Sequence, residues 1–172
     1  MDSGWLRIDL LTRDHDRSSF HCGEPTLDDY LHRFANQQQK NRHAAVYVAT
    51  DRRSPEKIIG YYTLSANAVQ TERLRGVIGS NLPAYELTPT TLLGRLEVDQ
   101  YAQGRGLGSY LLTDPLVSAS VQSSMISSHA IVVDALNDDV GSWYESHGFK
   151  RFADHQLQLV MPMKVVKQLF QS

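Results

Sequence analysis

The sequence predicts an α+β domain with a mixed β-sheet. Its length of 172 residues suits one domain with a hydrophobic core. Its hydrophobic share of 41% and charged share of 21% are those of an ordinary globular protein. Strand and helix patterns follow the order β-α-β-β-β-α-β-α-β along the chain. Because no repeat, low-complexity tract or Gly/Ser linker interrupts this order, residues 1–172 are expected to form one domain.

The first strand and the first helix show two different hydrophobic periods. Gly4 to Leu11 alternates between apolar and polar residues, as a half-buried strand does. Pro25 opens a helical stripe of apolar residues at positions i, i+3, i+4 and i+7, and Glu24 or Thr26 is the expected cap. The stripe consists of Leu27, Tyr30, Leu31 and Phe34.

A β-hairpin is expected next. Residues 44–50 and 57–66 have the composition of strands, and the polar turn 51–56 separates them. Residues 70–90 are expected to be irregular except for one short helix at Thr71–Ile78.

The second half of the chain predicts further strands and helices in alternation. The expected strands are Leu92–Val98, His129–Ala135 and Leu157–Met163, and the expected helices are Leu107 to about Ser120 and Asp138–His147. Pro115 lies inside the first of these helices, where it removes a hydrogen bond and is expected to kink or shorten the helix. Gly141 is expected to lower the stability of the second helix.

Composition excludes several classes of function. Cys22 is the only cysteine, so no intramolecular disulfide forms and a reducing cytoplasm is expected. The seven histidines lack metal-ligand spacing, so no metal site is expected. The sequence shows no membrane-spanning run and no signal peptide, so no membrane association is expected. The net charge of −2 gives no overall footprint for nucleic acid, although residues 30–75 hold eight basic residues against three acidic ones, a pattern typical of a solvated face.

The most informative segment joins the strand that ends at Val98 to the helix that begins at Leu107. Its three glycines, Gly104, Gly106 and Gly108, stand at alternate positions. Glycine permits positive φ and lets a ligand lie against bare backbone, and the first amides of a helix form a phosphate site. The spacing matches neither a Walker A loop nor the G-x-G-x-x-G fingerprint. The glycines alone therefore fit either a phosphate site or a tight strand–helix junction.

With its flanking residues, this segment resembles the coenzyme A signature of the GNAT N-acetyltransferases. Gln103-x-x-Gly106-x-Gly108 resembles their Gln/Arg-x-x-Gly-x-Gly/Ala motif, and Leu96-x-Val98 resembles their fourth strand. The resemblance implies a largely antiparallel mixed sheet of six to seven strands, about four helices and a V-shaped splay between strands 4 and 5. It also implies acetyl-CoA as co-substrate, bound by Leu96, Glu97, Val98, Gln103, Gly104, Arg105, Gly106, Leu107, Gly108 and Ser109.

A second element follows one strand later. Trp143-Tyr144-x-x-x-Gly148-Phe149 resembles the GNAT element A-x-x-F-Y-x-x-x-G-F. The resemblance implies that Tyr144 is the general acid for the departing thiolate, and it adds Asn137 to the cofactor-binding residues. A phenol with a pKa near ~10 donates a proton to a thiolate of pKa near ~8.5 at modest cost. Taken without the family, a Trp–Tyr pair is more typical of core packing.

Further motifs are similar to the acetyltransferase toxins of type II toxin–antitoxin modules. The matching segments are Phe20-x-Cys22-Gly23-x-x-x-Leu27-Asp28-x-Tyr30-Leu31, Ile59-Gly60-Tyr61-Tyr62-x-Leu64, Leu82-Pro83, Gly94-Arg95-Leu96-x-Val98-Asp99 and Val133-Asp134-Ala135. This resemblance implies acetylation of the α-amino group of aminoacyl-tRNA and a block of translation. It also implies a ribbon-helix-helix antitoxin as partner and a homodimer in the cytoplasm.

The substrate suits the residues present. An α-amino group has a pKa of about 8, so a useful fraction is already neutral at pH 7 and no strong base is required. Basic side chains are expected to hold phosphates of the acceptor stem. The candidates are Arg33, Lys40, Arg42, Arg73, Arg75 and Arg95.

Several alternatives stay open at this level. Glu97 stands where these toxins carry alanine, and it is either a general base or a carboxylate at the sheet edge. The acceptor amine is alternatively a protein N-terminus, a lysine or a small metabolite. A non-catalytic acyl-CoA-binding or interaction module is the remaining alternative.

Overall fold

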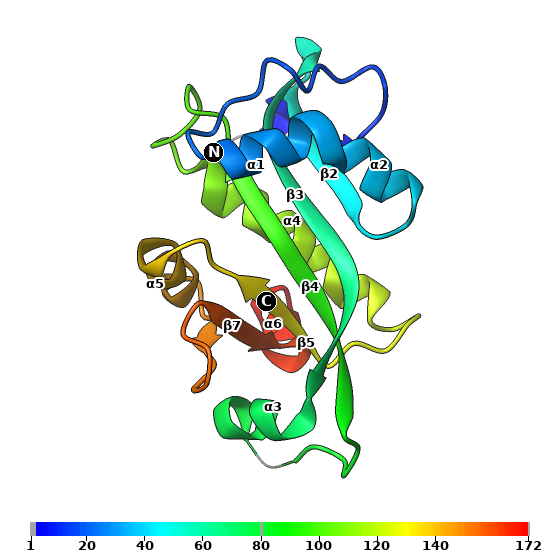
Figure 1. Cartoon of the computed structure of the whole chain (residues 1–172), viewed down its shortest axis with the longest axis vertical. Coiled ribbons are helices and arrows are strands. Elements are labelled where there is room, and N and C mark those ends of the chain that lie inside the picture. The colour runs from blue at the N-terminus through cyan, green and yellow to red at the C-terminus, as the bar shows by residue number, and fades with distance from the viewer. Residues whose placement is uncertain (1–2, 80, 172) are drawn as a thin grey trace. The chain divides into compact units, whose positions relative to one another are not determined.

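The computed structural model describes residues 3–79 and 81–171 (Figure 1). The strands are β1 (Leu6–Leu10), β2 (Ala45–Asp51), β3 (Ser54–Gln70), β4 (Leu87–Val98), β5 (Ala130–Asp134), β6 (Lys150–Arg151) and β7 (Gln158–Pro162). The helices are α1 (Pro25–Asp29), α2 (Ala35–Lys40), α3 (Thr71–Ile78), α4 (Leu107–Gln122), α5 (Asp138–Ser146) and α6 (Met163–Leu169). A 3₁₀ turn covers Ser3–Trp5, and a π-helical segment, Tyr30–Phe34, joins α1 to α2.

The strands follow the order β1-β2-β3-β4-β5-β7-β6 in a mixed sheet. The pairs β1–β2, β2–β3, β5–β7 and β6–β7 are antiparallel, whereas β4 and β5 are parallel. The parallel register joins Thr91–Leu93 to Ile131–Val133. This architecture confirms the expected α+β fold with a largely antiparallel sheet. The expected splay between strands 4 and 5 stays a prediction.

The described residues form two compact units. Unit 1 comprises residues 3–65 and 95–114, and unit 2 comprises residues 66–94 and 115–171. The strands β3 and β4 and the helix α4 therefore each contribute to both units. The expectation that residues 1–172 form one domain stays a prediction.

The core of unit 1 lies between the first helical segments and the hairpin β2–β3. Leu31 and Ala35 pack in one cluster with Val46, Val48 and Tyr61. Tyr62 follows Tyr61 on β3 and points to the opposite face of the sheet, because side chains alternate in a strand. Accordingly, the hydroxyl of the buried Tyr62 donates a hydrogen bond to Asp114 of α4.

The core of unit 2 joins α3 to the parallel part of the sheet. Leu74 of α3 packs in one cluster with Val132 of β5, Val160 of β7 and Phe152. The alternating Ala130 and Val132 of β5 face this cluster, whereas Ile131 and Val133 are buried without belonging to it. A strand with nearly every side chain buried is covered on both faces, as its continuous apolar sequence predicts.

Most predicted elements are confirmed, with shifted ends. The helix at Thr71–Ile78 has the predicted bounds, whereas β4 begins at Leu87 instead of Leu92. The early part of β4 was hidden by its polar sequence. Thr88 and Thr90 can be buried there because each hydroxyl has a partner. The hydroxyl of Thr88 pairs with that of Thr71, and the hydroxyl of Thr90 accepts a hydrogen bond from the side-chain amide of Asn67.

Other differences have simple causes. The hairpin turn is only Arg52–Arg53, since Ser54 already belongs to β3. Pro115 does not shorten α4, which continues to Gln122. Two short elements, β6 and α6, were not predicted.

Membrane spans and metal clusters were not expected from the sequence. Within residues 3–79 and 81–171, no helix has the length and apolar character needed to cross a bilayer. The same residues hold no group of three His, Cys, Asp or Glu side chains arranged for a metal ion.

Candidate active site

The glycine turn of unit 1 has the backbone conformation that its sequence predicts. Gly104 and Gly106 have φ values of 74° and 77°, in the left-handed region that L-residues with a Cβ avoid. A Cβ added at either position would meet no described atom within 4 Å. The glycines are therefore required for the backbone conformation and not for lack of space. The exposed main chain of the turn lies directly before α4.

Two side chains hold the start of this turn in place. Asp99 is buried, and its carboxylate accepts hydrogen bonds from the main-chain N–H groups of His21 (3.1 Å) and Tyr101 (3.0 Å). The side-chain amide of Gln103 donates to the carbonyl oxygens of Cys22 (2.7 Å) and Val98 (2.9 Å). The side chain of Gln103 therefore ties the turn to the segment that contains Cys22. Because this side chain is engaged in these bonds, the main chain of the turn is the part that can contact a ligand.

A pocket of about 250 Å³ lies beside the turn. Its lining is mainly apolar, and it combines the N-terminal 3₁₀ turn with the first residues of α4. The lining residues are Trp5, Leu6, Ala102, Arg105, Gly106, Leu107 and Tyr110. Arg105 is exposed at the turn and supplies a positive charge there. Main-chain amides, a helix N-terminus, an arginine and an apolar pocket together suit a diphosphate that carries an organic group.

The strand that leads into the turn carries Leu96, Glu97 and Val98, the residues predicted to contact the arm of the cofactor. Val98 is buried, whereas Leu96 and Glu97 are partly exposed. Burial, followed by the negative charges of Glu24 and Asp28, raises the pKa of Glu97 to about 7. Glu97 therefore titrates close to neutral pH, which the sequence did not reveal.

Cys22 is buried near this strand. Burial is the main cause that raises the pKa of its thiol to about 12. A thiol with this pKa is protonated at neutral pH, so Cys22 does not act as a nucleophile.

Tyr144 lies in the last turn of α5, in unit 2. Its ring makes edge-to-face contacts with Trp143 (5.0 Å between centroids) and Phe149 (5.4 Å). Its carbonyl oxygen accepts hydrogen bonds from the main-chain N–H groups of His147 (3.0 Å) and Phe149 (3.2 Å). These contacts fix the ring at the end of the helix, with 3% of the residue exposed.

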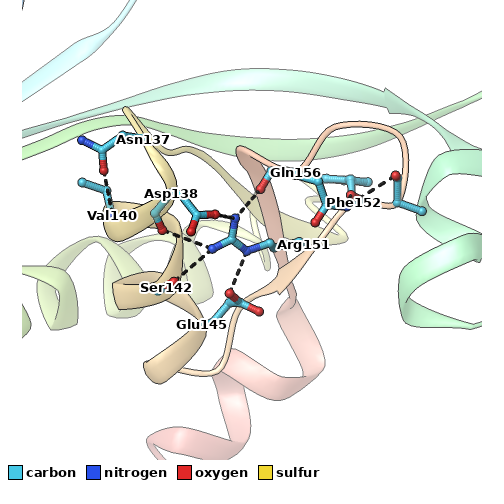
Figure 2. Close-up of polar contacts among 9 residues, drawn as sticks. Asn137, Asp138, Val140, Ser142, Glu145, Arg151, Phe152 and Gln156 are labelled. Carbon is cyan, nitrogen blue, oxygen red and sulfur yellow. Dashed lines mark hydrogen bonds and ion pairs between the residues drawn. The ribbon is translucent and has the colours of Figure 1, made fainter.

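Asn137 is the N-cap of α5. Its side-chain oxygen accepts a hydrogen bond from the N–H of Val140 at 3.0 Å (Figure 2). The side chain thus has a local structural function. Its predicted contact with the cofactor stays a prediction.

The basic residues predicted to bind tRNA fall into two groups. Arg33, Lys40, Arg42 and Arg95 belong to unit 1, and the first three are exposed. Arg33 pairs with Asp29 at 3.2 Å. The guanidinium of Arg95 lies 3.6 Å from the centre of the Tyr30 ring, in a cation–π contact.

Arg73 and Arg75 belong to unit 2 and have partners there. Arg73 binds Asp154 (2.7 Å) and Gln158 (2.7 Å) and lies over the ring of Phe152. Arg75 binds Glu72 (2.6 Å) and the carbonyl oxygens of Leu82 and Pro83. Both are less exposed than a free surface arginine, so their predicted contact with tRNA would compete with these bonds.

Two residues that shape the turn and its strand lie in motifs of the sequence, but sequence reasoning assigned neither of them a role. Asp99 stands out in the sequence only as part of a motif, although a charged residue directly after a buried strand is a signal for a turn-forming carboxylate. Gly60 of β3 is the second. A Cβ there would lie 3.2 Å from the carbonyl oxygen of Glu97 and 3.1 Å from Leu111. Gly60 thus permits the close fit of β3 against the strand that leads into the turn.

Comparisons with known proteins show which proteins the whole chain is similar to. The chain is 35% identical over 169 residues to a tRNA-acetylating toxin of Mycobacterium tuberculosis (strain ATCC 25618 / H37Rv), covering 97% of this chain and 98% of that protein. It is 25% identical to a probable toxin TacT of Sinorhizobium fredii (strain NBRC 101917 / NGR234), covering 90% and 89% of the two chains. No protein-family model matches the chain.

Solved structures are similar over nearly the whole chain. One of them is AtaT complexed with acetyl-methionyl-tRNAfMet, with a TM-score of 0.87, 28% identity and coverage of 96% and 99% of the two chains.

Proposed function

The chain belongs to the family of GNAT-type tRNA-acetylating toxins, and on this premise we propose that it transfers the acetyl group of acetyl-CoA to the α-amino group of an aminoacyl-tRNA. It is an acetyl-CoA-dependent N-acetyltransferase. The single observation that carries the proposal is the turn at Gly104 and Gly106, whose main chain is open and precedes a helix N-terminus. The diphosphate of coenzyme A suits this turn.

The reaction needs no covalent enzyme intermediate. The neutral amine attacks the acetyl carbon, the carbon–sulfur bond breaks, and the amine loses a proton to solvent, either directly or through Glu97. The thiolate takes a proton from the phenol of Tyr144, which solvent then restores. The main-chain N–H of Val98 is proposed to polarise the thioester carbonyl. This assignment makes Tyr144 the catalytic residue of the proposed mechanism.

An α-amino group is the acceptor that best suits these side chains. At pH 7 a lysine with a pKa near ~10.4 would cost roughly 4–5 kcal/mol to deprotonate, whereas an α-amine costs much less. A Glu97 carboxylate that titrates near pH 7 would be a weak base, sufficient for an α-amine. The aminoacyl end of a charged tRNA presents such an amine.

The partners follow from the same premise. We expect a ribbon-helix-helix antitoxin to hold the enzyme inactive, and we expect a homodimer in the cytoplasm. A related toxin, the Y144F mutant of AtaT, is known bound to the C-terminus of its antitoxin AtaR and acetyl-CoA. The basic residues of unit 1 are proposed to bind the phosphates of the acceptor stem.

The test is acetyl transfer by the intact protein. Purified enzyme, labelled acetyl-CoA and total charged tRNA are incubated, and the label is expected in the tRNA fraction as N-acetyl-aminoacyl-tRNA. Tyr144→Phe should lower kcat by about 10²- to 10⁴-fold, since it removes the general acid. Affinity for acetyl-CoA, measured by calorimetry, should stay unchanged.

Tyr85→Phe is the matched control, because Tyr85 is an exposed tyrosine of unit 2 outside the proposed site. It should leave kcat unchanged. Label that enters proteins or small amines instead of tRNA would favour a different acceptor. A Tyr144→Phe enzyme with full activity would remove the general-acid assignment.

A further inference from the structure

The position of Tyr144 depends on how α5 is held. The helix has only nine residues, from Asp138 to Ser146, and Tyr144 stands in its last turn. Asn137 caps the N-terminus, but a cap fixes only the first turn. A helix of this length is unstable in isolation, so contacts from outside must set its place.

One side chain outside the helix contacts α5 along its length (Figure 2). Arg151 of β6 donates from Nε to the carboxylate of Glu145 at 2.7 Å and from Nη1 to that of Asp138 at 2.7 Å. Its Nη2 also lies 3.2 Å from the carbonyl oxygen of Asp138 and 3.2 Å from the hydroxyl of Ser142. Nη1 also donates to the carbonyl oxygen of Gln156 at 3.0 Å. A single guanidinium thus joins the first, middle and last turns of α5 to the β6–β7 connection.

Gly141 makes this arrangement possible. A Cβ at this position would lie 2.8 Å from Nη2, 2.9 Å from Cζ and 3.0 Å from Nη1 of Arg151. The guanidinium therefore lies directly against the backbone of the helix. This close approach accounts for the glycine at position 141. Inside a helix, glycine lowers stability by about 1 kcal/mol relative to alanine.

The contacts of Arg151 are better suited to fix the position of α5 than to raise the free energy of unfolding. Arg151 has only 12% of its side chain exposed, whereas Asp138 and Glu145 are 83% and 47% exposed. Ion pairs with exposed partners contribute little to the free energy of unfolding. The planar guanidinium, however, fixes several acceptors at once, which a lysine ammonium cannot do.

We infer that Arg151 is a positioning residue for acetyl transfer, which holds α5 through Asp138, Ser142 and Glu145 so that the Tyr144 phenol meets the departing thiolate. This inference rests on the proposed function of Tyr144. Gly141 is its necessary counterpart, because any side chain there displaces the guanidinium. A misplacement of about 1 Å at a reacting group lowers a rate by about 10²-fold.

The experiment measures kcat, acetyl-CoA affinity and hydrogen exchange of the α5 amides in Arg151→Met, Arg151→Lys and Gly141→Ala. Arg151→Met should lower kcat by about 10- to 100-fold, and Arg151→Lys should recover part of the loss. Gly141→Ala should also lower kcat, although alanine favours the helix. Exchange should rise in residues 138–149, while acetyl-CoA affinity stays within about twofold of the wild type.

Gly76→Ala is the matched control. Gly76 lies in α3 of the same unit, and a Cβ there would meet no described atom within 4 Å. This variant should keep the kcat and the α5 protection of the wild type. In the double variant Gly141→Ala/Arg151→Met, the reductions in kcat should not add, because both changes remove the same interaction.

The outcomes separate this inference from the proposed function. A wild-type enzyme that acetylates no charged tRNA would contradict the proposed function. Wild-type exchange of α5 in Arg151→Met would overturn the positioning inference whatever the tRNA result. Faster hydrogen exchange in α5 with an unchanged kcat would also overturn the positioning inference, because Arg151 would then have only a structural role.

Discussion

At the scale of single residues, Glu97 has an environment that changes its titration. Its carboxyl is partly buried on the strand that leads into the glycine turn, with the carboxylates of Glu24 and Asp28 near it. The pKa raised to about 7 favours the neutral form in the folded protein. The sequence left a general base and a sheet-edge carboxylate as alternatives, and both have measurable consequences.

Replacing Glu97 with glutamine should change how stability depends on pH. The pKa of Glu97 is about 7 in the folded protein and has an ordinary value of 4.5. Protonation of Glu97 therefore contributes its full stabilisation of the folded state below pH 4.5, and this contribution is lost as the pH rises through 7. Glu97→Gln has no such loss, and it should therefore be more stable than the wild type above pH 7, by at most about 3 kcal/mol. Urea unfolding at about pH 4.5, 6 and 8 measures the difference.

The same variant tests catalysis. A general base would give the wild type a kcat limb with an apparent pKa near 7, absent from Glu97→Gln. An identical pH–rate profile in both proteins would exclude Glu97 as the general base. Equal pH dependence of unfolding would contradict the raised pKa itself.

At the scale of elements, α5 depends on its N-cap. Asn137→Ala removes the acceptor for the Val140 N–H and should lower the free energy of unfolding by about 1 kcal/mol. Asn137→Asp keeps a capping oxygen and should retain most of this stability. Urea unfolding measures both variants. Acetyl-CoA affinity that falls equally in both would indicate that the amide also contacts the cofactor.

The elements also show what the sequence could predict. The apolar pattern of the sequence located β5 well, because its continuous apolar run is buried on both faces, and the short helix expected at Thr71–Ile78 has the bounds of α3. It misplaced the start of β4, because Thr88 and Thr90 are buried through hydroxyl pairs that no hydrophobic pattern reveals. The glycine turn could be predicted because the residues that determine its conformation are neighbours in the sequence and form a recognisable motif.

Interactions between distant residues were beyond such reasoning. Gly141 looked like a defect in its helix, since nothing in the sequence shows that Arg151 lies against it. The raised pKa of Glu97 depends on Glu24 and Asp28, about 70 residues earlier. The excess of basic residues in 30–75 is typical of a solvated face, yet Arg73 and Arg75 have partners in unit 2.

At the scale of the whole molecule, the distribution of charge is the property that matters for tRNA. The exposed residues Arg33, Lys40 and Arg42 lie close together in the chain, at the end of the first helical region of unit 1. Arg73 and Arg75 would have to give up internal bonds before binding phosphate. The first group is therefore the better candidate surface.

Charge reversal of Arg33, Lys40 and Arg42 to glutamate should weaken tRNA binding by at least about 10-fold at about 0.1 M salt. The slope of log K against log salt should become shallower by about 0.7–0.9 for each phosphate that the variant no longer neutralises. Filter binding at several salt concentrations measures both quantities. The matched control reverses Arg52, Arg53 and Lys57, three exposed basic residues of the same unit. Equal weakening in the two triple variants would indicate an unspecific effect of net charge.

The buried thiol of Cys22 has a practical consequence for enzymology. Because burial raises the pKa of this thiol to about 12, Cys22 is overwhelmingly protonated at pH 8. A chromogenic disulfide reagent added during turnover should therefore react with liberated coenzyme A and leave the folded polypeptide unlabelled. Continuous colorimetric rates can be recorded on the native sequence, with no need to remove its one sulfhydryl.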